Sequence, residues 1–96
     1  MLENRFKQKL IGELEDMFPG CIILHMDPNE HQGIPDLLIL YNDRWAALEG
    51  KRHRNANIRP NQNYYVNRMN QMSYAAFIYP ENKEEILYEL QQALGL

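Results

Sequence analysis

The chain has 96 residues, of which 45% are hydrophobic, so its composition is that of one small globular domain and excludes a disordered segment. No apolar run approaches the roughly 18 residues that cross a membrane, and residues 1–9 lack the apolar core of a signal peptide. A single cysteine, Cys21, excludes an internal disulfide and fits a reducing compartment, so we expect a cytoplasmic protein. The formal net charge of −3 is not the basic balance that is usual for nucleic-acid-binding domains.

Basic residues are nevertheless concentrated in one part of the chain. Residues 44–68 contain one acid, Glu49, and six basic side chains: Arg44, Lys51, Arg52, Arg54, Arg59 and Arg68. A solvated loop is the simplest explanation of this stretch. A local basic strip beside carboxylates is also able to contact phosphate groups.

Residues 3–18 are predicted to form an amphipathic helix that ends at Pro19-Gly20, with Phe6, Leu10 and Leu14 on its apolar stripe. Glu3 falls on the same stripe instead of the polar face. Acids in a first helical turn are common because they interact favourably with the helix dipole. The alternative is that Glu3 is a functional carboxylate on the buried side of this helix.

A strand over residues 21–26 and a polar loop over residues 27–33 follow. His25 and His31 lie in this region without a second histidine or a cysteine at ligand spacing. Isolated histidines of this kind are more often structural or exposed than metal ligands.

Two apolar runs, Leu37–Tyr41 and Trp45–Leu48, flank Asn42-Asp43 and predict a β-hairpin. If the turn is symmetric, the numbers of paired residues add up to 85, so that Asp36 faces Glu49. Like charges in directly opposite positions destabilise a sheet. Lys51 lies two residues beyond Glu49 and therefore points to the same face. Because both hairpin faces are apolar, we expect cover on both sides of the sheet.

A helix is predicted over residues 60–72, beginning at Pro60, and Gln62 is the only polar member of its apolar stripe. Residues 74–79 form a predicted strand, and the strand–helix–strand order makes this strand parallel to the second strand of the hairpin. Asn82 and Glu85 are predicted to form a capping box at the start of a last helix.

Glu3, Gln62 and the group Asp36, Glu49 and Lys51 are thus unusual polar residues at the ends of elements, and a shared active-site rim would explain all of them. Paired carboxylates without cysteine or paired histidine favour Mg²⁺ or Mn²⁺ over zinc. Such an ion polarises a phosphoryl oxygen, and a neighbouring lysine orients water or balances charge. This combination predicts phosphodiester hydrolysis.

The sequence resembles the PD-(D/E)XK nucleases at Pro35-Asp36 and Glu49-Gly50-Lys51. The stretch from Gly33 to Leu38, with Gln62 at the start of the next helix, is similar to the VRR-NUC and Holliday-junction-resolvase-like branches, many of which are phage-encoded. The resemblance extends from about Glu3 to Tyr79. It departs from the family pattern at Gly50, where the residue is commonly bulky and apolar.

The resemblance implies an α/β fold with a restriction-endonuclease-like α-β-β-β-α-β core, a mixed four-stranded sheet flanked by helices, and here a C-terminal helix within one nuclease domain over residues 1–96. It implies that Asp36, Glu49 and the Gly50 carbonyl bind Mg²⁺, that Glu3 binds through water, and that Lys51 acts on the nucleophilic water beside Gln62. We expect the basic loop to bind DNA through Arg52, His53, Arg54 and Arg59.

The leading hypothesis is therefore a Mg²⁺-dependent DNA endonuclease that is specific for branched DNA and acts as a homodimer. A nicking or end-processing nuclease, and an inactive nucleic-acid-binding module of the same fold, are alternatives. A phage-encoded protein would act in the host cytoplasm.

Overall fold

The computed structural model describes residues 2–96, with side chains described from residue 4 onward. The elements follow the order α1 (Leu2–Met17), β1 (Ile22–His25), β2 (Leu37–Tyr41), β3 (Arg44–Gly50), α2 (Pro60–Met72), β4 (Tyr74–Ile78) and α3 (Lys83–Ala93). This order confirms the predicted elements, with bounds shifted by one or two residues.

The strands form one four-stranded mixed sheet in the order β1-β2-β3-β4. β1, β2 and β3 pair antiparallel, and β4 is parallel to β3. The predicted hairpin register is confirmed, since Tyr41 pairs with Arg44 and Leu38 pairs with Ala47. Asn42 adopts a positive φ of 55° in the turn, a conformation that asparagine tolerates.

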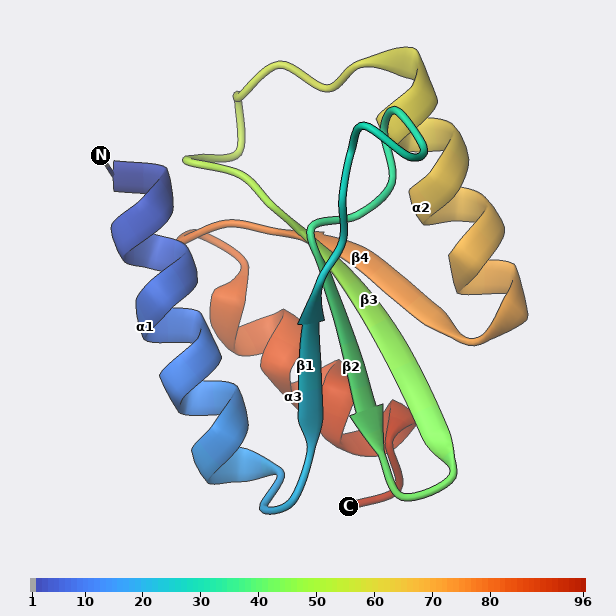
Figure 1. Ribbon diagram of the computed structural model, residues 1–96. Helices are drawn as coiled ribbons and strands as arrows, with labels where there is room; N and C mark the ends of the chain where they lie inside the picture. The colour runs from blue at the N-terminus through green and yellow to red at the C-terminus, as the bar shows by residue number, and fades with distance from the viewer. Residues whose placement is uncertain (1) are drawn as a thin grey trace.

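Helices α1 and α3 cover one face of the sheet, and α3 lies behind the strands in Figure 1. Their apolar side chains pack on alternate residues of the hairpin, as a strand period of two requires. The fully buried side chains of this core include Leu10, Leu14, Phe18, Ile39, Leu48 and Leu90.

The opposite face is covered less completely than the sequence suggests. Helix α2 packs Val66 and Met69 on Ala47 and Ala75 of β3 and β4. Over β2 it leaves an apolar groove of about 410 Å³, whose lining includes Leu38, Leu40, Trp45, Tyr65, Met69 and Met72. Ile22 and Leu24 of β1 are 56% and 43% exposed. Both faces of the sheet are thus covered, as expected, but the cover over β1 and β2 is incomplete because a single helix of 13 residues does not reach across them.

The predicted capping box at the start of α3 is wrong. Asn82 is the N-cap residue, but its side chain makes no bond to the helix. Its amide oxygen accepts from the Tyr79 N–H at 2.9 Å, and its amide nitrogen donates to the Phe77 carbonyl at 3.0 Å. Asn82 thus fixes the turn that leaves β4.

Among the described residues, no helix has both the length and the apolar character that crossing a bilayer requires.

Candidate active site

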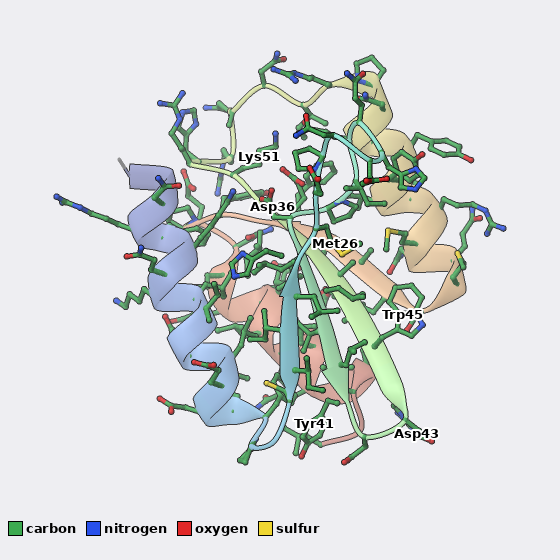
Figure 2. All side chains as sticks on the ribbon, viewed as in Figure 1. Met26, Asp36, Tyr41, Asp43, Trp45 and Lys51 are labelled. Carbon is green, nitrogen blue, oxygen red and sulfur yellow. The ribbon has the colours of Figure 1, made fainter. Side chains whose placement is uncertain are left out.

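Asp36 and Glu49 lie at the end of the sheet where β1, β3 and β4 finish and β2 begins. The pairing of β2 with β3 extends as far as Leu37 and Leu48, one pair before these two acids. Asp36 and Lys51 are at this end in Figure 2, whereas Tyr41 and Asp43 are at the opposite end. The hairpin therefore brings two carboxylates and a lysine to one end of the sheet.

Asp36 is held by contacts from three directions. Its backbone carbonyl accepts from the Met26 N–H at 2.8 Å, which extends the pairing of β1 and β2. Its side-chain Oδ2 accepts from the Gly50 N–H at 3.1 Å and lies 2.8 Å from Lys7 Nζ on α1. The carboxylate is thus tied to both the end of β3 and helix α1.

Glu49 is the only charged residue buried in the described part of the chain, with 5% of its surface exposed. The pKa of its carboxyl is raised to about 7, first by burial and second by the neighbouring Asp36 charge, while Lys51 and Lys7 oppose the shift. Without an additional cation, Glu49 is protonated in a substantial fraction of molecules at neutral pH. A bound divalent ion would favour the ionised form instead.

Gln62 connects these residues to helix α2. Its Nε2 donates to Glu49 Oε2 at 3.4 Å, and its Oε1 accepts from Lys51 Nζ at 2.8 Å. The same oxygen accepts from the Arg59 N–H at 3.1 Å, which satisfies one donor at the start of the helix. The polar residue on the apolar stripe therefore does join the group around Glu49.

Lys51 is positioned by β4, which pairs with β3, and by the loop that follows β3. Its backbone N–H donates to the Ile78 carbonyl at 2.8 Å. Its Nζ donates to the Asn57 carbonyl at 3.1 Å as well as to Gln62. The ammonium is therefore held at the edge of the site without a direct bond to either carboxylate.

A polar cleft of about 350 Å³ opens beside this group and is lined by Asp36, Glu49, Gln62 and Arg59. Its other wall is the loop over residues 28–34. Gly33 adopts a φ of +89°, and a Cβ there would lie 2.6 Å from the Asn61 carbonyl carbon. The loop thus packs directly on the start of α2. Sequence reasoning did not include this wall in the site, although Gly33 was a possible sign of close backbone approach.

Of the four residues predicted to bind DNA, Arg59 lines the cleft, and the other three lie in the loop between β3 and α2. Arg52, His53 and Arg54 are exposed in the loop that precedes α2, and Arg59 is exposed where that helix begins. The Arg54 N–H donates to Glu81 Oε1 at 3.2 Å, and the Asn55 N–H donates to His53 Nδ1 at 3.2 Å. These bonds hold the loop backbone while the basic side chains stay at the surface.

Two further candidates from the sequence, Glu3 and His31, and one residue that the sequence analysis missed complete the description of this region. The side chain of Glu3 lies outside the described residues. His31 packs edge-on against Tyr65 with ring centroids 6.3 Å apart, which is a structural contact. Lys7, which the sequence analysis did not identify, lies in the site.

The described side chains include no group of three His, Cys, Asp or Glu residues arranged to hold a metal ion. Asp36 and Glu49 therefore make a site of two carboxylates. Any ion there would complete its coordination with backbone carbonyls, water or residues outside the described side chains, as Mg²⁺ commonly does.

Comparisons with protein-family models, with curated proteins and with solved structures find no match. The functional argument consequently depends on the geometry of the site.

Proposed function

We propose that this protein is a metal-dependent DNA endonuclease with a PD-(D/E)XK core of the VRR-NUC or Holliday-junction-resolvase-like type. The observation that carries the proposal is the convergence of Asp36, Glu49, Lys51 and Gln62 at one end of the sheet. Gln62 is in hydrogen-bond contact with both Glu49 and Lys51, and Asp36 is bonded to the residue between Glu49 and Lys51.

The donor atoms fit Mg²⁺, with Mn²⁺ as a substitute. Asp36 and Glu49 supply hard oxygen ligands, and because burial and the Asp36 charge raise the pKa of Glu49, a bound cation would favour its ionised form. We assign the ion to Asp36, Glu49 and the Gly50 carbonyl, with Glu3 holding it through water. When bound, such an ion polarises a phosphoryl oxygen and lowers the pKa of water.

Lys51 is the residue that acts on the attacking water or on the charge of the transition state. Its ammonium is held by two acceptors, Gln62 Oε1 and the Asn57 carbonyl, and this fixed position suits a donor that stabilises developing negative charge. Gln62 is a positioning residue, because it joins Lys51 to Glu49.

DNA is held by the basic loop in this proposal. Arg52, His53, Arg54 and Arg59 contact phosphates on either side of the scissile bond, which would lie in the cleft between the carboxylates and the loop over residues 28–34. Contacts to phosphate position the substrate without reading its sequence.

We also propose that two copies associate through the apolar groove and the adjoining exposed side chains of β1. Contiguous exposed apolar surface in a soluble protein often marks an interface. Arg68 is the only charged residue in the lining of the groove, so a second copy seated there covers mainly apolar side chains. A dimer presents two active sites, which suits cleavage of branched DNA.

The test is cleavage of labelled junction, flap, duplex and single-stranded DNA with Mg²⁺ or Mn²⁺. Asp36→Ala and Lys51→Ala should abolish cutting, whereas Asp43→Ala, at the opposite end of the sheet, should not. Preference for the junction supports branch specificity, and preference for duplex or single strands supports a nicking or end-processing enzyme. If the wild type never cuts and still binds DNA, the inactive binding module becomes the better description.

A further inference from the structure

Lys7 places a positive charge on the carboxylate that the proposed function assigns to the metal. Its Nζ lies 2.8 Å from Asp36 Oδ2, and the two side chains are 23% and 31% exposed. The same oxygen accepts the Gly50 N–H at 3.1 Å. One of the two Asp36 oxygens is therefore already engaged by two donors.

Gly50 is what allows Lys7 to reach this position. A Cβ at residue 50 would lie 3.0 Å from Lys7 Cε and 3.3 Å from Lys7 Cγ, so the stem of the lysine crosses the space that a side chain would fill. Gly50 is not among the glycines with positive φ, and its backbone conformation is open to other residues. The glycine is thus explained by the lysine stem and not by backbone geometry.

The charge of Lys7 acts on both carboxylates. It pairs with Asp36 directly, and together with Lys51 it opposes the rise in the pKa of Glu49. The Lys7 ammonium therefore supplies part of the positive charge that a bound metal ion would supply. An ammonium and a divalent ion on one partly buried carboxylate would repel each other strongly, since Coulomb energies grow as the local dielectric falls.

We propose that Lys7 is an internal counter-ion that competes with the divalent metal for Asp36, and that Gly50 lacks a side chain in order to admit it. This inference rests on the proposed metal site. Metal loading then requires the Lys7–Asp36 ion pair to open, so the protein binds the ion more weakly than its carboxylates alone would allow. Because such coupling is reciprocal, removal of the ammonium should tighten metal binding by roughly 5- to 150-fold.

The experiment measures Mn²⁺ affinity by electron paramagnetic resonance of the free ion, without DNA and without an activity readout. Lys7→Met keeps an apolar stem and removes the charge. Lys9→Met is the matched control, because it removes the same charge from an exposed position on the same helix. Gly50→Ala crowds the lysine stem, which has to shift to make room for the added Cβ, without changing any charge. Its control is Gly12→Ala, where a Cβ would meet no atom within 4 Å.

Tighter Mn²⁺ binding by Lys7→Met and Gly50→Ala, with both controls close to the wild type, is the expected result. Unchanged or weaker binding by a folded Lys7→Met, in a wild type that does bind Mn²⁺, overturns the competition and leaves the proposed function intact. If the wild type and Lys7→Met both fail to bind Mn²⁺ at millimolar concentration, the metal site itself is wrong and the inference falls with it. Thermal unfolding in chelator confirms that each variant is folded.

Discussion

The side chains of Lys51 and Gln62 form a direct hydrogen bond, with Nζ 2.8 Å from Oε1. Lys51 follows the last residue of β3, and Gln62 lies in the first turn of α2, so this bond joins the end of the sheet to the start of the helix. Because Gln62 also donates to Glu49 through its amide nitrogen, the orientation of the amide is fixed by an acceptor on one side and a donor on the other.

Replacement of Gln62 by methionine should slow cleavage without preventing metal binding. Methionine fills a similar volume but cannot accept from Lys51 or from the Arg59 N–H. A misplacement of about 1 Å in a catalytic group costs on the order of 100-fold in rate, and loss of the bond at the helix start costs about 1 kcal/mol of stability. Single-turnover rates and Mn²⁺ affinity provide the two measurements.

Gln92→Met is the control for this prediction, since Gln92 bonds to Tyr88 on α3 and lies outside the site. A Gln62→Met variant that cuts at the wild-type rate would show that Lys51 needs no positioning by the amide. A variant that loses Mn²⁺ binding would instead assign Gln62 to the metal.

Glu49 should make the metal-free protein less stable as the pH rises. Its folded pKa of about 7 exceeds the usual 4.5, so the folded state holds more protons than the unfolded chain between these two values. The free energy of unfolding therefore falls from about pH 4.5 to about pH 7 and is level above that range. A shift of this size corresponds to about 3 kcal/mol. Urea unfolding in chelator at a series of pH values measures the fall.

Glu49→Gln removes the titrating group and keeps the shape of the side chain. We expect its stability to be nearly independent of pH over the same range, and to exceed that of the wild type at pH 8. Parallel curves for wild type and variant would mean that the fall arises elsewhere. Saturating Mn²⁺ should reduce the fall in the wild type, because the ion stabilises the ionised carboxylate.

The sequence allows the hairpin and much of the site to be predicted because their causes are local. The period-two apolar pattern and the Asn42-Asp43 turn determine the register, and the register brings Asp36 and Glu49 to one edge. Gln62 was recognisable because it interrupts an apolar stripe. These inferences require no knowledge of how one element packs on another.

Lys7 and the incomplete cover of the sheet were not predictable, because both depend on tertiary placement. On a helical pattern Lys7 resembles any solvated lysine, and its contact with Asp36 exists only because α1 packs across Gly50. The apolar residues of α2 indicate a buried face but do not specify which strands it covers. The side chain of Asn82 likewise finds its partners in β4 and the following turn instead of in its helix.

Neutralising charges in the basic loop should weaken DNA binding and make the affinity depend less steeply on salt concentration. Arg52→Gln and Arg54→Gln each remove a charge proposed to contact phosphate. The slope of log affinity against log salt should fall by about 0.9 for each lost contact to duplex DNA. Fluorescence anisotropy over a range of salt concentrations measures the slope, with chelator present to prevent cleavage.

Arg44→Gln is the control for this prediction, because Arg44 lies at the opposite end of β3 and donates to the Ala93 carbonyl at 3.3 Å. An equal change in slope for Arg44→Gln would show a general effect of net charge. An unchanged slope in the loop variants would place the DNA elsewhere on the surface.

A charge on the exposed face of β1 should separate the proposed dimer. Leu24 is 43% exposed and lies beside Leu38 in the sheet, on the same face as the apolar groove. Leu24→Lys therefore places an ammonium within the proposed contact at little cost to the monomer, and a symmetric interface brings two copies of that charge together.

Tyr88→Lys is the matched control, since Tyr88 is 61% exposed on α3, beyond the other face of the sheet. Light scattering at assay concentration should give twice the chain mass for wild type and Tyr88→Lys, and the single mass for Leu24→Lys. A wild type that is monomeric throughout, or a Leu24→Lys variant that stays dimeric, would exclude this face as the interface.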